Sequence, residues 1–435
     1  MAQAHLFRMV RLNDRYSSQV FTFLIPASIA QDSTMECHSK DFMYGNQKWS
    51  IMLSHNEKHL SAYLTLKNVS EGMRCIVDFG FTMLNQEHFT KNESFLERNV
   101  EFTRDRPTNG RRIFVPVTDI LGRRFENEDN FILLECEIRA IRTHFEQVIQ
   151  LPREGKETST YRYPKFETNY FTFGNFEWNL SVYPFGDTPE SEGRPLIYLT
   201  RQTSFGHSCR VQYRLILGYA DRILQTEVLE QVLDTSGGGN PYDVGQTLYS
   251  FAIQRVRLPI HVELLSVTAI SEIQLDPCRR GKNKSHLYDR DKQAWMLETE
   301  LVSDKLKMKL YYADVHNVPR GFSRLMCWGV AVLPIPGKGQ ARRALRSPFV
   351  KYYVQDETDE GYDIYTDITN SEVRFSNSLS HFLQFLIDFS HCLVPKHIPS
   401  FFIQLLHFPV FIINTAYHSD SSAQCGYCVL LTKFV

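Results

Sequence analysis

The sequence predicts a mostly β protein made of consecutive antiparallel β-sandwiches, and three observations support this prediction. The 435-residue chain is 13% aromatic, with 31 Phe and 21 Tyr, and aromatic rings pack well on the half-buried surface of a sheet. Short runs of alternating apolar and polar residues are separated by turn residues, which is typical of sandwiches. A pattern headed by a tryptophan occurs at Trp49, Trp178 and, more weakly, Trp295. Its period of roughly 120 residues is too long for a solenoid repeat and favours tandem domains.

The first unit is expected to span residues 1–153, and strands account for most of it. Residues 5–25 predict one or two strands, and the alternating runs 60–66 (LSAYLTL) and 74–84 (RCIVDFGFTML) predict two more. Residues 131–141 (FILLECEIRAI) predict the strand that closes the unit.

The piece between these strands is expected to be less regular. Residues 89–102 are polar and mixed, which predicts a loop or a short helix. Residues 104–110 predict a turn, because the final Asn109 and Gly110 tolerate positive φ. A short strand at residues 113–117 and a helical turn at residues 118–122 are expected to follow.

Two linkers and a change in composition predict the remaining domain boundaries. The polar stretches 151–160 and 276–285 are the expected linkers, which places a second sandwich at residues 160–276 and a divergent third β module at 286–375. The glycine-rich residues 236–241 are expected to form a loop within the second sandwich.

Residues 376–435 are expected to be an apolar tail of uncertain structure, because they contain only four charged side chains. Residues 398–417 are long enough to span a membrane, but Gln404, His407, Pro409 and Asn414 interrupt the apolar run. A membrane-associated sandwich scaffold, using this tail and the basic linkers, is therefore the alternative to a soluble one.

The net charge and the cysteine content limit the possible partners and the cellular compartment. A net charge of -1 predicts no nucleic-acid partner. Nine cysteines, mostly isolated from one another, and a start without a signal peptide favour a cytoplasmic location. The oligomeric state and the identity of any partner stay open.

We expect no enzymatic activity, cofactor or metal. The sequence contains no nucleophile elbow, phosphate-binding loop, dinucleotide fingerprint or HExxH motif. Cys425 and Cys428 have the spacing of a zinc knuckle, but a structural zinc site needs four ligands and His407 and His418 fit no standard pattern.

The first unit resembles a meprin and TRAF homology (MATH) domain. The resemblance rests on residues 42–53 (FMYGNQKWSIML), 60–66, 79–85 (FGFTMLN) and the closing strand 131–138, and it covers about residues 5–148. The second unit is similar through residues 178–184 (WNLSVYP). The resemblance implies an eight-stranded antiparallel sandwich that binds extended peptides in a shallow groove across one sheet. It also implies a role as an adaptor or scaffold.

By position, the family's groove would involve His59, Phe79, Val100 and the Arg111–Arg112 pair that follows Gly110. Tyr213 stands in the second unit where Phe79 stands in the first. If this groove is used, the two arginines would favour acidic or phosphorylated peptides, because guanidinium groups pair with carboxylate and phosphate. Two simpler interpretations stay open. Phe79 and Tyr213 would be core aromatics, and the arginine pair would be a solvated turn.

Overall fold

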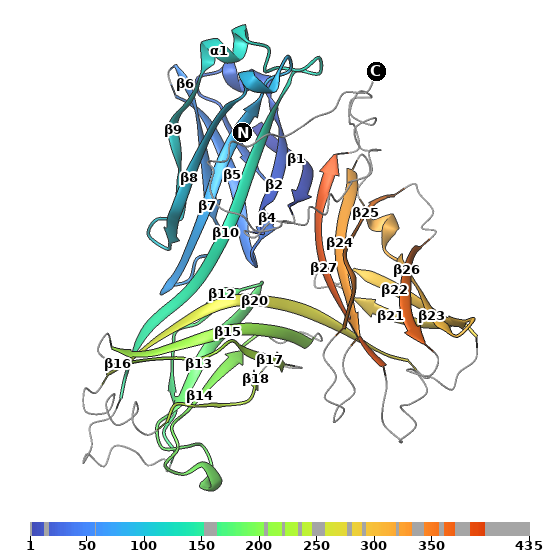
Figure 1. Ribbon diagram of the computed structural model, residues 1–435. Helices are drawn as coiled ribbons and strands as arrows, with labels where there is room; N and C mark the ends of the chain where they lie inside the picture. Colours follow the sequence, from blue (N-terminus) through green and yellow to red (C-terminus); the bar gives the residue numbers. More distant parts are fainter. Residues whose placement is uncertain are drawn as a thin grey trace, which may run out of the picture. The chain divides into compact units, whose positions relative to one another are not determined.

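The fold is described from a computed structural model. The residues described are 2–12, 17–56, 58–151, 163–203, 208–219, 222–233, 237–245, 257–275, 281–288, 293–318, 322–332, 343–355, 361–369 and 383–395. Antiparallel strands dominate these residues, which confirms the predicted mostly β fold (Figure 1).

The first module is a sandwich of two sheets. One sheet contains β3 (Glu36–Ser39), β4 (Phe42–Tyr44), β5 (Gln47–Asn56), β6 (His59–Leu66) and β9 (Thr108–Pro116). The other contains β1 (Ala2–Arg11), β2 (Gln19–Pro26), β10 (Phe131–Gln150), β7 (Met73–Leu84) and β8 (Glu93–Thr103). Two short 3-10 helices, η1 (Ala27–Ala30) and η2 (Phe89–Lys91), and the predicted helical turn, α1 (Val117–Gly122), connect strands.

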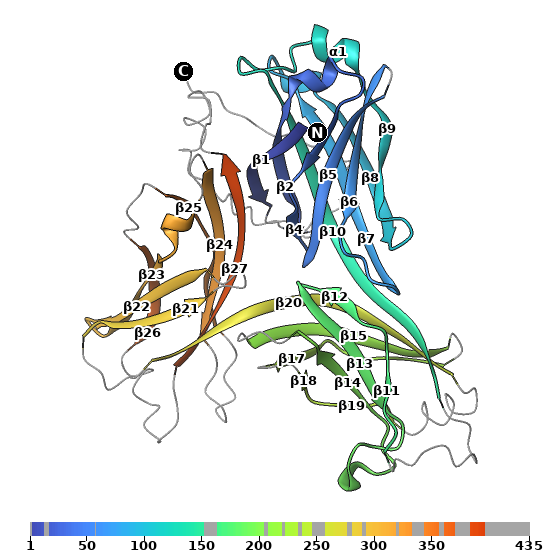
Figure 2. The ribbon, with the colours of Figure 1, turned by 180° about the vertical axis from the view of Figure 1, so that it is seen from behind.

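The two sides of this sandwich differ. On one side β1 joins the sheets, because its first residues pair in parallel with β3 and its later residues pair antiparallel with β2. On the opposite side the sheets end in β8 and β9, which lie close together in both views (Figures 1 and 2). The sandwich is thus closed along one side by a shared strand and ends in two separate strands along the other.

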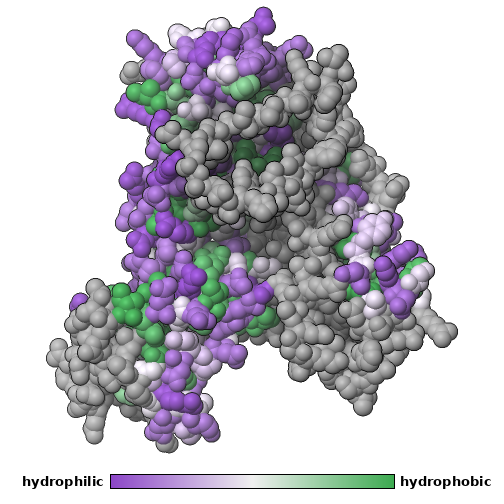
Figure 3. All heavy atoms as spheres, in the orientation of Figure 1, coloured by the Kyte–Doolittle hydropathy of each residue, from purple (hydrophilic) through white to green (hydrophobic). Residues whose placement is uncertain are grey.

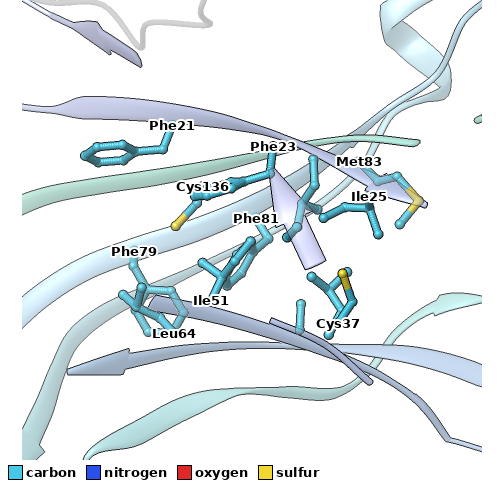
Figure 4. Close-up of a cluster of buried hydrophobic side chains, with 14 of the residues drawn as sticks. Phe21, Phe23, Ile25, Cys37, Ile51, Leu64, Phe79, Phe81, Met83 and Cys136 are labelled. Atoms are coloured by element: carbon cyan, nitrogen blue, oxygen red, sulfur yellow. The ribbon is translucent and has the colours of Figure 1, made fainter. Parts of the chain in front are cut away.

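Apolar side chains from both sheets fill the space between them (Figure 4). Alternation along each strand produces this layer, since every second side chain points inward. In β7, Val77, Phe79, Phe81 and Met83 are all fully buried. The core is therefore the direct result of the period-two pattern seen in the sequence.

Two hairpins have the same geometry in the first and second modules. In the first, Gly45 and Asn46 have φ values of +57° and +62°, and the indole N–H of Trp49 donates to the Tyr44 carbonyl at 3.0 Å. In the second, Gly174 and Asn175 have φ values of +63° and +62°. There the indole N–H of Trp178 donates to the Phe173 carbonyl, also at 3.0 Å. A two-residue turn with two positive φ values suits the twist of a hairpin.

The strand β10 lies in a sheet that continues from the first module into the second. It pairs with β2 up to Ile138 and with β20 (Arg257–Leu275) from Thr143 to Gln150, while its pairing with β7 continues on the other side to Phe145. Figure 1 shows β10 as one continuous arrow. The register shifts between Arg139 and Arg142, and Ala140 has a φ of +52° at this position. A bulge thus separates the part of β10 that pairs with β2 from the part that pairs with β20.

The second module has two sheets around a second core. One sheet contains the end of β10 with β20, β15 (Ser208–Tyr219), β16 (Arg222–Gln225) and β17 (Leu229–Leu233). The other contains β11 (Phe166–Glu167), β12 (Phe171–Phe173), β13 (Phe176–Tyr183), β14 (Leu196–Arg201), β18 (Gly237–Gly238) and β19 (Tyr242–Asp243). The 3-10 helix η3 (Pro189–Ser191) lies between β13 and β14.

The third module also pairs its strands in two sheets. The first contains β24 (Phe322–Val332), β25 (Arg343–Val354), β27 (Leu383–Pro395) and the end of β20. The second contains β21 (Asn283–Tyr288), β22 (Ala294–Val302), β23 (Lys305–Tyr312) and β26 (Tyr362–Thr369). A 3-10 helix, η4 (Val315–Asn317), follows β23. The buried Trp295, Trp328 and Tyr312 form much of its core.

Two local predictions in the first module are wrong. Residues 89–102 form η2 and most of the strand β8 instead of a loop or short helix. Asn109 and Gly110 lie inside β9 instead of in a turn. Both segments look irregular in sequence because they are edge strands, whose polar side chains face solvent on more than one side.

The structure also corrects three predictions in the later modules. Residues 283–285, assigned to a linker, begin the strand β21. Gly237 and Gly238, assigned to a loop, pair as a two-residue strand with Thr200 and Arg201. Part of the predicted tail forms β27, so the third module continues beyond residue 375. The first linker after Leu151, and the apolar run at residues 398–417, lie outside the described residues.

Candidate functional site

The candidate site is the open edge of the first module, by which we mean the strands β8 and β9. Within the described part of the chain, β8 pairs only with β7 and β9 only with β6. Each strand therefore has one side that forms no β-ladder in the described part of the chain, although the Glu101 carbonyl of β8 accepts a hydrogen bond from the Asn109 side chain of β9. Such a side is a template on which another extended chain can pair.

Bulges shape both strands of the open edge. The register of β8 on β7 shifts between Val77 and Phe79, where the Asn99 N–H donates to the Asp78 side chain at 2.8 Å and Asn99 has a φ of +51°. The register of β9 on β6 shifts between Leu60 and Ala62. Bulges at sheet edges bend a strand and redirect its side chains. They explain why several successive side chains of β9 are exposed.

Gly110 allows β9 to approach β6 closely. A Cβ atom at this position would lie 2.1 Å from the Ala62 carbonyl oxygen and 2.7 Å from the Tyr63 Cα. Both atoms belong to the backbone and cannot move aside. Next to it, the buried Asn109 donates from Nδ2 to the Glu101 carbonyl of β8 at 3.2 Å. Asn109 and Gly110 thus hold β9 against both β6 and β8.

Two carboxylates of the open edge, Glu93 and Glu97, are paired with arginines. The Arg111 Nε donates to Glu97 Oε1 at 2.7 Å, and its guanidinium lies 4.6 Å from the centre of the Phe95 ring. At the start of β8, Arg123, which follows α1, contacts Glu93 at 2.6 Å and Asp119 at 2.9 Å. These two carboxylates, Glu93 first, raise the pKa of the Arg123 guanidinium.

The structure brings four of the six predicted residues to this side of the sandwich. His59 begins β6 opposite Pro116 of β9, and Val100 lies in β8 opposite Val77; both are half-buried. Arg111 and Arg112 are exposed on β9. The arginine pair is therefore part of a strand, and the alternative interpretation as a solvated turn is wrong. No ion-pair partner of Arg112 is found among the residues described.

Phe79 and Tyr213 do not lie on a surface in this structure. Phe79 is fully buried and packs near Leu64 and Ile51 between the sheets of the first module (Figure 4). Tyr213 is 1% exposed in the core of the second module, where its hydroxyl accepts a hydrogen bond from Gln231 at 2.9 Å. Their placement agrees with the simpler interpretation as core aromatics, and it removes them from the groove.

Two apolar residues of the open edge were not singled out from the sequence. Ile113 of β9 is 66% exposed and Leu96 of β8 is 37% exposed. Figure 3 shows a mainly hydrophilic surface with separate hydrophobic spots along the described part of this side. The only sequence signal for Ile113 is that it directly follows two arginines, which breaks the alternation. Exposed apolar groups beside unpaired backbone groups are what a peptide ligand needs.

Comparison with known protein families agrees with this architecture. A MATH domain model matches residues 28–110. The predicted resemblance to the MATH family is confirmed for this segment, which runs from η1 into β9. No match was found among curated proteins. MATH domains in general are modules for protein–protein interaction, and the MATH segment includes His59, Phe79 and Val100 and ends directly before Arg111.

Two other features bear on the alternatives. In the described ranges, no helix is long and apolar enough to cross a membrane. In the same ranges, no three His, Cys, Asp or Glu side chains are grouped so that they could hold a metal ion. The basic residues Lys282 and Lys284, which were assigned to a basic linker, lie 2.8 and 3.9 Å from the Glu298 carboxylate.

Proposed function

We propose that the first module recognises an extended peptide segment of a partner protein at the open edge, and that the chain acts as a non-enzymatic adaptor or scaffold. The observation that carries this proposal is the combination of two strands with an unpaired side and the exposed Ile113 and Leu96 on them. The MATH segment supports it, because it covers β8 and the start of β9.

The physical basis is strand addition. An extended peptide pairs its backbone with an edge strand, and the hydrogen bonds supply affinity that does not depend on the peptide sequence. Alternate side chains of the peptide then meet the side chains of the edge, which provides selectivity. On β9 those side chains are Arg111, Arg112 and Ile113.

The charges on β9 indicate the ligand chemistry. Arg111 already pairs with Glu97, so an incoming anion would have to replace that carboxylate. Arg112 is exposed and has no ion-pair partner in the described part of the structure. Arg112 is therefore the residue that supports binding of an acidic or phosphorylated side chain, with Ile113 contacting an apolar neighbour.

The test is a peptide-array screen with the full-length chain, followed by titration of the peptides that bind. We expect Ile113→Asp to weaken binding at least tenfold, because it places a charge where an apolar contact forms. Arg112→Ala should weaken binding of acidic or phosphorylated peptides only. Ile223→Asp is the matched control, since Ile223 is also an exposed isoleucine in a strand, at 57% exposure in the second module.

Two outcomes would contradict the proposal. Equal loss of binding in Ile113→Asp and Ile223→Asp would mean that a non-specific hydrophobic contact was measured. Absence of any bound peptide, with a chain that unfolds cooperatively, would mean that the MATH likeness is limited to architecture. Circular dichroism of each variant establishes that folding is intact.

We further propose that the second module is a divergent second MATH-like sandwich. Support comes from the shared Gly-Asn turn and from the equal indole hydrogen bonds of Trp49 and Trp178. A cytoplasmic location is consistent with the free thiols of Cys37, Cys75, Cys136 and Cys209, all of which are buried. Burial raises the pKa of the Cys37 thiol to about 12, which makes it unreactive.

A further inference from the structure

Two histidines face each other across the strand pair that β10 forms with β20. His144 of β10 and His261 of β20 lie on the same face of the sheet, and their nitrogens Nδ1 and Nε2 are 2.8 Å apart. The ring centres are 4.9 Å apart. Both rings are half-buried. This distance is that of a hydrogen bond between the two imidazoles.

Charged residues on all the neighbouring strands surround the pair. Arg74 of β7 forms an ion pair with Glu146 of β10, whose carboxylate lies 3.7 Å from His261 Nδ1. Arg214 of β15 forms an ion pair with Glu263 of β20 at 2.8 Å. The two carboxylates that could compensate a charged imidazole are therefore already paired with arginines.

The hydrogen bond between the rings limits how many protons the pair can hold. One nitrogen must donate its proton and the other must accept it, so the acceptor cannot itself be protonated. A first added proton leaves this bond intact, because the donor ring can be an imidazolium while the acceptor ring stays neutral. A second proton makes both nitrogens donors, removes the bond and places two cations within 5 Å of each other.

We propose that His144 and His261 form an acid-sensitive latch between β10 and β20, which holds the strand pair while the rings share a hydrogen bond and loosens it when both rings are protonated. The latch acts on Thr143–Gln150 and on the strand that pairs with it, residues 257–264. It is a device built into the strand that the first and second modules share, and it does not depend on peptide binding.

The environment of the rings fixes the direction of the effect. Burial lowers the pKa of His144 below its usual value of 6.5, and the neighbouring His261 and Arg74 lower it further. Burial also lowers the pKa of His261, with Glu146 opposing and Arg74 reinforcing the effect. Groups with a lowered pKa bind fewer protons in the closed strand pair than in the open one. Stability of the pair is therefore complete above pH 6.5 and decreases as the pH falls below 6.5.

The first experiment measures opening of this strand pair in the full-length chain. Hydrogen exchange of the backbone amides in residues 143–150 and 257–264 is followed from pH 7.5 to 5.0 and corrected for the intrinsic exchange rate. Each proton taken up only by the open state multiplies the opening constant by about ten per pH unit. We expect protection to be constant above pH 6.5 and to fall up to about 100-fold per pH unit below it.

Variants separate the latch from general acid sensitivity. His144→Asn and His261→Gln each keep a neutral amide near the original nitrogen and remove one titrating group. In each variant the opening constant should therefore rise less steeply with falling pH than in the wild-type chain, by a factor of up to about ten per pH unit. His286→Gln is the control, because His286 is an exposed histidine in β21 of the third module. An unchanged pH dependence in both latch variants would overturn the proposal.

A second measurement does not rely on variants. The ring carbons of the histidines are labelled with ¹³C in the wild-type chain and titrated by nuclear magnetic resonance. We expect the resonances of His144 and His261 to titrate below pH 6.5 in separate steps. The second step should coincide with the loss of amide protection. Titration of both rings in a single step at pH 6.5 would show that no proton is shared, and the latch would be ruled out.

Discussion

At the scale of single residues, the buried tryptophans have the clearest role. Trp49 is fully buried, packs edge-to-face on Phe102 with ring centres 5.1 Å apart, and uses its indole N–H to satisfy the Tyr44 carbonyl. Trp178 makes the same bond to Phe173 in the second module. One side chain therefore fills the core and also supplies the hydrogen-bond donor that a buried carbonyl near the Gly-Asn turn requires.

This role predicts that Trp49→Phe destabilises the chain by about 2–4 kcal/mol, because the Tyr44 carbonyl loses its donor and the smaller ring leaves a cavity. Chemical unfolding followed by circular dichroism measures the change. Tyr365→Phe is the control: Tyr365 is 81% exposed, so its effect should stay within about 0.5 kcal/mol. A Trp49→Phe change as small as that of the control would contradict the assigned role.

The sequence predicted which residues share a face but not always which face is buried. Alternation along β7 groups Phe79 with Val77 and Phe81, and it would look the same whether that set faced the core or a ligand. The structure places the whole set in the core. The partner of Arg111 was also out of reach, because Glu97 is far from it in sequence and belongs to a strand that was predicted as a loop or helix.

At the scale of elements, β9 shows why local turn chemistry can mislead. Asn-Gly favours a turn when only neighbouring residues are considered. In β9 the glycine is needed for another reason: β6 approaches so closely that no Cβ fits, and the asparagine side chain bonds to β8. Tertiary contacts therefore override the local preference. In contrast, the strands β6 and β7 were predicted well, because each is paired on both sides within a sheet and alternates over most of its length.

The close approach predicts that Gly110→Ala destabilises the first module by about 2–4 kcal/mol, since β9 would have to move away from β6. It should also weaken any peptide binding at the open edge. Gly122→Ala is the matched control. No atom lies within 4 Å of a Cβ at that position, which is near the end of α1. The control should be neutral or stabilising, and thermal unfolding of both variants distinguishes the two positions.

At the scale of the whole molecule, the shared strand β10 makes the module boundaries different from those predicted. The buried positions of β10 change from even numbers (Cys136, Ile138) to odd numbers (Thr143, Phe145) across the bulge at Ala140, and the predicted strand ended at residue 141. Phe145 and Ile149 follow the bulge and belong to the core of the second module. The predicted boundary at residue 153 would therefore leave part of the second core attached to the first module.

A fragment of residues 1–153 should consequently expose apolar surface. Phe145 would lose Phe171, on which it stacks with ring centres 4.2 Å apart, and the end of β10 would lose its pairing with β20. We expect this fragment to bind the dye ANS and to self-associate, whereas the full-length chain does neither. A monomeric fragment without dye binding, as measured by light scattering and fluorescence, would contradict the shared role of β10.

The continuous β10 also determines how the chain would respond to a pulling force. A flexible linker transmits tension without resisting it and extends first. In β10, tension along the strand would act on the hydrogen-bonded ladders with β7 and β20 in shear, so many bonds would carry the load at the same time. The connection between the first two modules would therefore resist extension through the same kind of ladders that hold the sheets themselves together.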